Sequence, residues 1–403
     1  MKRLRLSLVL VCLGLAVWSL SGVAFAQIAY ERRTVLDWSS DGQFIALGSA
    51  EGAVKVFDAQ FKRFTHEIKA HQGRVSRISW SPIDNKLLTG GGYDNTAKIW
   101  RIDADTSPII LLASTPFIAL DWKLDAQEIA TAVAEGSTNL IIWNVVTGER
   151  LRTGYIGTNL VIRWNISGTQ IATGHLSGTA VYIFDANSTK LLYTLDVNAT
   201  TKTWLISLDW SKDDAYLLGS DGYGRVFVWE VGNQKLVHTF NSAAVEDITV
   251  GDPFTHAALK ARFSADGRSV QAINADGTIR SWDLATGQLL SEVKVASPIV
   301  SAAWSPYGAQ LVVDLLNPPQ GDAQDALSAN HLQILVPFAS LDQFKAIASV
   351  CITNAAEQAA LQAKAASESL AGLSAYVSSL PVEVIPPACA ADLLAIAAAL
   401  QGN

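Results

Sequence analysis

A histidine, a hydroxyl and a carboxylate lie within 24 residues of one another and together could form a catalytic triad. They are His71, Thr89 and Asp94, and Trp100 follows them. A triad needs a nucleophile that a histidine can activate, and this nucleophile often sits on a sharp, exposed turn. Thr89 instead falls within the stretch KLLTGG, which is typical of a β-strand. The sequence therefore argues against nucleophilic catalysis at Thr89.

Other kinds of site chemistry have no motif in this sequence. It contains no HExxH, no CxxC and no EF-hand loop, and no glycine-rich phosphate loop between a strand and a helix. Thirty basic and 37 acidic residues give a formal charge of −7, so no basic surface points to a nucleic-acid partner. We therefore predict no cofactor, no metal and no nucleic-acid partner.

Regularly spaced aromatic residues indicate how the side chains are positioned. Seven aromatic residues each begin a turn-like segment such as WSSDG or WSPID: Trp38, Trp80, Trp122, Trp164, Trp210, Phe263 and Trp304. The steps between them are 42, 42, 42, 46, 53 and 41 residues. A second aromatic follows six of them after 19 to 21 residues, at Phe57, Trp100, Trp143, Phe184, Trp229 and Trp282. The chain therefore contains seven repeats.

Each repeat holds four short stretches that favour β-strands. In the second repeat these are VSRISW, KLLTGG, TAKIW and IILLA, separated by Gly, Asp, Asn and Pro. Four strands in a period of 40–45 residues are typical of one propeller blade. The large rings suit the gap between neighbouring sheets, where each buries a large apolar area. The predicted fold class is all-β, a seven-bladed β-propeller.

Residues 28–338 resemble a WD40-repeat protein, and the motifs are specific as a set although each repeat is degenerate. The dipeptide that names the family, or a near variant of it, occurs at Trp282-Asp283, Phe57-Asp58, Phe184-Asp185 and Trp229-Glu230. The family's turn aspartate appears at Asp94, Asp221 and Asp276. The resemblance implies that His71, Thr89, Asp94 and Trp100 form a buried structural tetrad. It also implies that residues 28–33 supply the outer strand of the last blade.

The residues just before the seven first aromatics should lie near the axis of the ring, because they belong to the innermost strands. They are Asp37, Ser79, Asp121, Arg163, Asp209, Arg262 and Ala303. Three acids and two bases nearly neutralise one another, and we favour ion pairing between blades. The alternative is a cation or ligand site in the central channel.

Two insertions interrupt the regular spacing, at residues 241–256 and 316–330. In the family's topology both emerge on the same face, and long loops in a compact fold are usually functional or mobile. They lack Lys and Arg and carry Glu246, Asp247, Asp252, Asp322 and Asp325. We interpret them as an acidic recognition face for a basic or polar partner; neutral surface drift is the alternative.

The C-terminal residues have a different composition, rich in Ala, Leu and Ser, which favours helices. Ser340 with Gln343, and Asn354 with Glu357, have the spacing of helix-capping boxes. Cys351 and Cys389 are predicted to form a disulfide that closes a loop of about forty residues and contributes roughly 3–4 kcal/mol. Two buried free thiols are the alternative. The extension either caps the propeller or docks a partner.

The N-terminal residues read as a secretory signal peptide. Residues 2–5 carry three basic side chains, residues 6–20 are apolar, and Ala24-Phe25-Ala26 supplies a cleavage site before Gln27. An uncleaved anchor is the alternative, although the apolar run is shorter than the ~20 residues that a spanning helix needs.

The sequence thus predicts three parts: a signal peptide over 1–26, a propeller over 27–338 whose N-terminal strand closes the last blade, and a helical extension over 339–403. The predicted protein is an exported, bacterial-type WD40 protein of the periplasm, cell envelope or extracellular space. Its predicted function is a non-catalytic scaffold that binds a protein or another macromolecule through the loop-bearing face. Two alternatives stay open: an exported propeller hydrolase or lyase with a site in the central channel, and a structural subunit of the cell envelope.

Overall fold

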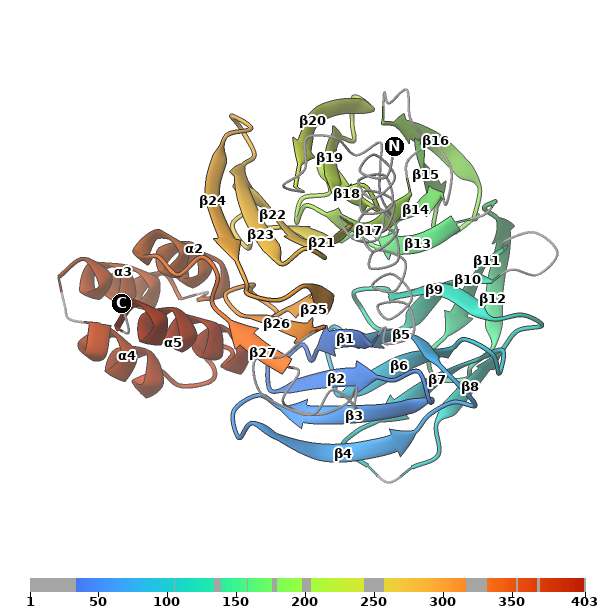
Figure 1. Cartoon of the computed structure of the whole chain (residues 1–403), viewed down its shortest axis with the longest axis horizontal. Helices are drawn as coiled ribbons and strands as arrows, with labels where there is room; N and C mark the ends of the chain where they lie inside the picture. The colour runs from blue at the N-terminus through green and yellow to red at the C-terminus, as the bar shows by residue number, and fades with distance from the viewer. Residues whose placement is uncertain are drawn as a thin grey trace, which may run out of the picture.

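The computed structural model describes residues 34–104, 106–133, 139–157, 159–175, 180–197, 204–242, 257–316, 332–352, 354–367 and 370–401. Within these residues the chain forms seven antiparallel sheets arranged in a ring, and four helices lie beside the ring next to its last blade (Figure 1). In every sheet the strands pair in sequence order, from the innermost strand outward. The predicted seven-bladed propeller with a helical extension is confirmed.

The first blade comprises β1 (Val35–Trp38), β2 (Phe44–Gly48), β3 (Ala53–Asp58) and β4 (Arg63–Lys69). The second comprises β5 (Val75–Trp80), β6 (Lys86–Gly91), β7 (Thr96–Arg101) and β8 (Ile109–Leu112). The third comprises β9 (Phe117–Trp122), β10 (Glu128–Val133), β11 (Asn139–Asn144) and β12 (Arg150–Tyr155). The fourth comprises β13 (Asn159–Trp164), β14 (Gln170–His175), β15 (Ala180–Asp185) and β16 (Leu191–Asp196).

The fifth blade comprises β17 (Leu205–Trp210), β18 (Tyr216–Asp221), β19 (Arg225–Glu230) and β20 (Lys235–Asn241). The sixth comprises β21 (Ala258–Phe263), β22 (Ser269–Asn274), β23 (Thr278–Asp283) and β24 (Leu289–Lys294). The seventh has three strands among the described residues: β25 (Ile299–Trp304), β26 (Leu311–Leu315) and β27 (Leu332–Leu335).

The aromatic residues that mark the repeats lie between neighbouring sheets, as the spacing predicts. All seven first aromatics are buried, each at most 7% exposed. Trp122 of the third blade, for example, belongs to one apolar cluster with Leu88 and Ile99 of the second. Burying such large rings stabilises the contact between blades and keeps the sheets at a fixed spacing.

The described residues close the ring between the first and last blades. The Trp38 indole N–H donates to the Ala303 carbonyl oxygen at 3.0 Å, and β1 packs beside β25. The Thr34 hydroxyl donates to the Asp314 carboxylate on β26. The predicted closing strand at residues 28–33 and the predicted signal peptide at 1–26 lie outside the described residues.

The turn after the innermost strand is held by a serine–aspartate pair in the first, fifth and sixth blades. The Ser39 hydroxyl donates to Asp41 Oδ1 at 2.5 Å and accepts the Phe44 N–H at 2.8 Å. Gly42 has a φ of +71°, a left-handed conformation that glycine adopts without steric cost. The same Ser–Asp hydrogen bond recurs in Ser211–Asp213 and Ser264–Asp266. These turns are therefore rigid and alike in several blades.

The helical extension comprises α2 (Leu341–Cys351), α3 (Ala355–Ser367), α4 (Leu370–Ser379) and α5 (Pro387–Gln401). Ser340 caps α2 by accepting the Gln343 N–H at 3.0 Å, and Asn354 Oδ1 accepts the Glu357 N–H at 3.2 Å. Both capping positions were predicted from the sequence. No described helix has the length and apolar composition that are needed to cross a membrane.

Candidate functional site

The described residues offer three regions in which a site could form: the two faces of the ring and its central channel. Adjacent antiparallel strands are joined at alternate ends, so each type of connection emerges on one face. We call one side the loop face; it carries the second-to-third-strand turns at 49–52, 92–95, 222–224 and 275–277. We call the other the turn face; it carries the first-to-second-strand turns at 39–43, 211–215, 264–268 and 305–310.

On the loop face the structure brings together the four residues that the sequence assigned to a tetrad. His71 Nδ1 lies 2.9 Å from Asp94 Oδ2, and His71 Nε2 lies 2.8 Å from the Thr89 hydroxyl. The Trp100 indole N–H donates to the same hydroxyl at 3.0 Å. When Nδ1 carries the proton and donates to Asp94, Nε2 accepts the hydrogen bond of the Thr89 hydroxyl. Each of these side-chain groups then has a hydrogen-bond partner. We call these four residues the His71 network.

The His71 network has the connectivity of a catalytic triad but not its accessibility. Thr89 is 0% exposed and His71 is 2% exposed, so a substrate has no direct path to the hydroxyl. Burial lowers the pKa of His71 despite the nearby Asp94, which keeps the imidazole neutral. Although burial opposes it, the pKa of Asp94 is lowered by the Gln72 N–H and by His71. The result is an ionised carboxylate that ties a loop to the second blade.

A tyrosine beside the His71 network is strongly exposed. Tyr93 is 73% exposed and directly precedes Asp94. The Asp94 carboxylate accepts the backbone N–H of Gln72 at 3.1 Å. The turn that carries Tyr93 is thereby joined to the loop between β4 and β5. Gly73 leaves room for the ring, because an added Cβ there would lie 2.9 Å from Tyr93 Cδ2. The loop face thus presents an aromatic side chain on a rigid support.

The two acidic insertions begin and end on this face where the structure describes their neighbours. The Ser242 hydroxyl donates to Asn274 Oδ1 at 2.7 Å, next to the turn 275–277. The Leu316 N–H donates to the Pro298 carbonyl at 2.9 Å, at the connection into the seventh blade. The five predicted recognition residues lie outside the described residues: Glu246, Asp247, Asp252, Asp322 and Asp325.

The turn face is covered in part by α5. Asp392 is 1% exposed and accepts the Ser305 hydroxyl at 2.7 Å, the Gln310 Nε2 at 3.1 Å and the Ala309 N–H at 3.2 Å. An added Cβ on Gly42 of the first blade would lie 3.2 Å from Ala388 of α5. Burial raises the pKa of Asp392, because these neutral donors compensate only part of its lost hydration. The extension thus packs against the seventh and first blades.

The cysteine pair lies within the core of the extension. Cys351 at the end of α2 and Cys389 in α5 are joined by a disulfide with Cα atoms 6.0 Å apart. Both belong to an apolar cluster that also contains Ala265 and Ala309 of the propeller. The disulfide therefore fixes α2 to the helix that carries Asp392.

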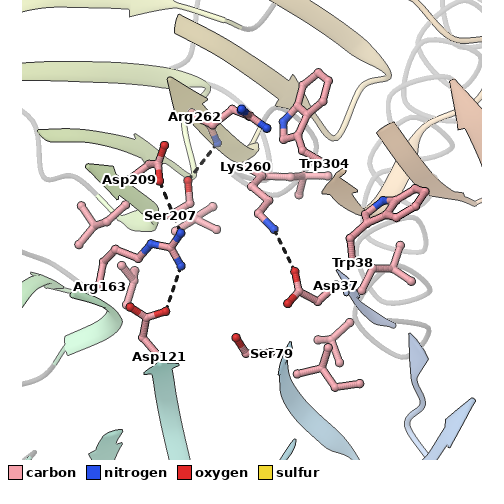
Figure 2. Close-up of a pocket in the computed structure, with 18 of the residues that line it drawn as sticks. Asp37, Trp38, Ser79, Asp121, Arg163, Ser207, Asp209, Lys260, Arg262 and Trp304 are labelled. Atoms are coloured by element: carbon pink, nitrogen blue, oxygen red, sulfur yellow. Dashed lines mark hydrogen bonds and ion pairs between the residues drawn. The ribbon is translucent and has the colours of Figure 1, made fainter. Parts of the chain in front are cut away.

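The central channel is a cavity of about 1060 Å³ lined by the innermost strands of all seven blades. Figure 2 shows charged side chains from several blades around this space. Arg163 pairs with Asp121 at 3.0 Å and with Asp209 at 3.5 Å, which joins three consecutive blades. The Asp121 carboxylate raises the pKa of Arg163, so the guanidinium stays charged. This is the ion pairing between blades that the sequence favoured.

The three ring aspartates also hold the backbone of the following blade. Asp37, Asp121 and Asp209 each accept the N–H of the next blade's first aromatic, at 2.8 to 3.0 Å. Burial raises the pKa of Asp37 and of Asp121, although nearby cations oppose it. These carboxylates are therefore already engaged in joining the blades. Within the described ranges no group of three or more His, Cys, Asp or Glu side chains is arranged to hold a metal ion.

Two charged residues were missed from the sequence. Lys260 lies two positions before Arg262 on β21, and its ammonium reaches Asp37 at 3.9 Å across the channel. Strand alternation would have found it, because residues i and i+2 share a face. Asp392 is the lone acid in an apolar helical segment, which signals a buried partner but not which one.

The comparisons with known proteins support the resemblance to the WD40-repeat family. The family model described as "Anaphase-promoting complex subunit 4 WD40 domain" matches residues 16–82. The "Anaphase-promoting complex subunit cdc20" of Dictyostelium discoideum is 24% identical over 62% of this chain and 48% of its own length. The "B-type cell cycle switch protein ccs52B" of Medicago truncatula is 22% identical over 66% of this chain and 54% of its own length. The chain thus spans about half the length of these two relatives.

Proposed function

We propose that this protein is a non-catalytic scaffold that binds a protein partner through its loop face, outside the cytoplasm. One relative is named as a subunit of the anaphase-promoting complex, and it is similar to this chain over 62% of the chain's length. A subunit acts by contacting other proteins, and the WD40-type ring gives this chain a comparable platform. Fold alone does not fix function, so the proposal rests on the geometry of the loop face.

The observation that carries the proposal is the exposed, rigidly supported Tyr93. Tyrosine is enriched at protein interfaces, where its ring buries much area with little loss of side-chain entropy. The His71 network and the Gln72–Asp94 hydrogen bond hold the loops beside it before any partner arrives. Such preorganisation reduces the free energy that ordering the surface would cost on binding. In this view the His71 network has a structural role.

The acidic insertions extend the same surface. The chain leaves the described propeller near Ser242 and near Leu316, and both points lie on the loop face. Their five acidic side chains would favour a basic or polar surface on the partner and would speed its association at low salt. The turn face is less suited, because α5 already covers the turn 305–310.

A binding experiment with two aromatic-residue variants tests the proposal. The protein would be crosslinked to neighbouring proteins in its native extract, and each captured protein would then be titrated as a purified component. Y93A is expected to weaken binding by tenfold or more, as for an interface hot spot. F61A is the matched control, because Phe61 is 64% exposed but lies in the turn between β3 and β4, on the opposite face of the ring. Equal affinities of the two variants would contradict the proposed surface.

Export is tested by the N-terminus of the protein isolated from its source. Cleavage before Gln27 yields a mature chain that begins with that residue. Mass spectrometry of the N-terminal peptide distinguishes this chain from one that still carries Met1. An intact N-terminus on protein in the cytoplasmic fraction would contradict export without affecting the proposed loop-face interaction.

A further inference from the structure

The central channel carries an excess of positive charge in a protein that is acidic as a whole. Beside the three ring aspartates, six basic residues line it among the described residues: Arg74, Arg77, Arg163, Lys212, Lys260 and Arg262. The complete sequence has a formal charge of −7. A cavity lined mainly by one sign of charge concentrates ligands of the opposite sign. The channel therefore differs electrostatically from the rest of the molecule.

The positive charges are unevenly neutralised. Arg163 has two carboxylate partners, Asp121 and Asp209. Lys260 faces Asp37 at 3.9 Å, a long separation for an ion pair. Arg262 donates to two carbonyl oxygens, at 2.8 and 3.4 Å, and has no carboxylate at ion-pair distance among the described residues. The least neutralised charge thus lies on β21, which supplies both Lys260 and Arg262.

The cations of β21 and Arg163 disfavour one another in the absence of an anion. Lys260 and Arg262 lie two positions apart on one strand, and their side chains therefore share its channel-facing side. Burial lowers the pKa of Lys260 although the Asp37 and Asp209 carboxylates oppose it, and the charges of Arg163 and Arg262 lower it further. Burial also lowers the pKa of Arg262; Asp209 and Asp392 oppose this shift, and Arg163 adds to it. Figure 2 shows Lys260 and Arg163 extending toward one open space and the Arg262 guanidinium beside Trp304, above Lys260.

We propose that the channel is a binding site for a small polyanion bearing phosphate or carboxylate groups, held by Lys260, Arg262 and Arg163. Guanidinium groups match the geometry of such oxyanions, and the lysine adds a mobile point charge. The volume of about 1060 Å³ lies slightly above the range of small-molecule sites, roughly 300–1,000 Å³, so the channel can hold a ligand of that size. The three ring aspartates are less available to a cation, since each already accepts a backbone N–H.

Isothermal titration calorimetry with pyrophosphate and with citrate tests this site in the full-length protein. We expect at least one of them to bind at low ionic strength, with an affinity that falls as salt is added. Stronger binding of pyrophosphate indicates a phosphate ligand, and stronger binding of citrate indicates a carboxylate ligand. K260Q should weaken binding about tenfold, as the loss of one charge-assisted contact implies. K69Q is the matched control, since Lys69 is exposed on β4, outside the channel.

A second variant tests the same charge balance without removing a cation. D37N removes the carboxylate that faces Lys260 and still offers an oxygen to the Trp80 N–H. It should strengthen anion binding severalfold, and it keeps the proposal falsifiable if K260Q does not fold. Absence of binding by both probes, equal affinities of K260Q and K69Q, or a D37N affinity at or below that of the wild type would each overturn the proposal. None of these results bears on the Y93A test of the loop face.

Discussion

The His71 network and the Asp392 contact both join separate parts of the molecule through a carboxylate, but the two carboxylates are compensated differently. Asp94 lies beside an imidazole, a backbone N–H and the Thr96 hydroxyl, and its pKa is lowered despite partial burial. Asp392 is more deeply buried and receives a hydroxyl, an amide and a backbone N–H, and its pKa is raised. One contact favours the ionised carboxylate, and the other favours the protonated form.

The difference shows how each contact relates to the fold around it. The His71 network lies within the second blade and the loop that enters it. There the pairing of β5, β6 and β7 holds the strands in place independently of the network's own hydrogen bonds. The Asp392 contact joins a helix to a turn that is distant in sequence, and only the extension holds that helix in place. We therefore expect the extension to detach as a unit and the His71 network to open only with its blade.

The disulfide should have the largest effect, and it should fall on the extension. Replacing Cys351 and Cys389 with serine removes a link across a separation of 38 residues. The chain-entropy model predicts a loss of about 4 kcal/mol in the free energy of unfolding of the extension. Hydrogen exchange should show faster exchange in α2 and α5 and little change in β5–β7. An equal effect on the second blade would contradict the separation of the two regions.

Removal of the Asp392 carboxylate should have the next largest effect. Asp392→Ala leaves the Ser305 hydroxyl and the Ala309 N–H without their partner in a buried contact. Unpaired buried donors cost about 1–3 kcal/mol each, so we expect a loss of about 3 kcal/mol. Glu383→Ala, at an exposed position between α4 and α5, is the matched control. Limited proteolysis between the propeller and α2 reports detachment; unchanged protection in Asp392→Ala would contradict this role.

Thr89→Val should have a smaller effect, confined to the second blade. The substitution keeps the β-branched shape but removes the hydroxyl that bonds His71 and Trp100. We expect a loss of about 1–2 kcal/mol, since the buried His71 ring and the partly buried Trp100 N–H each lose a partner. Thr65→Val is the control on the exposed strand β4. Thermal unfolding with hydrogen exchange resolves the location, and faster exchange in α5 instead of β6 would argue against a local network.

The sequence predicted the fold far better than the contacts between its parts. The spacing of aromatic residues from Trp38 to Trp304 depends on strand and turn lengths that each blade must repeat. The same pattern therefore occurs seven times in one sequence. The four residues of the His71 network lie within one such copy. The structure brings them together, because a fixed local geometry connects them.

Contacts between parts without a repeated pattern were less predictable. Asp392 could be recognised as unusual in an apolar helix, but nothing in its surroundings specifies the Ser305 turn as its partner. Lys260 was not predicted because only the residue directly before each first aromatic was assigned to the channel. Lys260 lies two positions before that residue on β21, and its long side chain also reaches the channel. Side-chain length and packing direction decide such contacts.

A change of pH should affect the two regions in opposite directions, and this is the smallest of the expected effects. The pKa of Asp392 is raised in the folded state, so its contribution to stability is greatest below its unfolded value of 3.8 and is lost as the pH rises through the folded value. The pKa of His71 is lowered from 6.5, so the stability of its network is present above that value and is lost as the pH falls through the folded value.

Acidification from pH 7.5 toward pH 5 should therefore loosen the loops around Tyr93 while the extension holds at least as firmly. Hydrogen exchange, corrected for the intrinsic effect of pH on amide exchange, measures both regions in one sample. His71→Gln removes the titrating group and should flatten the response of the second blade alone. Parallel loosening of α5 and β6 on acidification would contradict the opposite pH responses that follow from the raised pKa of Asp392 and the lowered pKa of His71. The comparison on which these predictions rest would then fail.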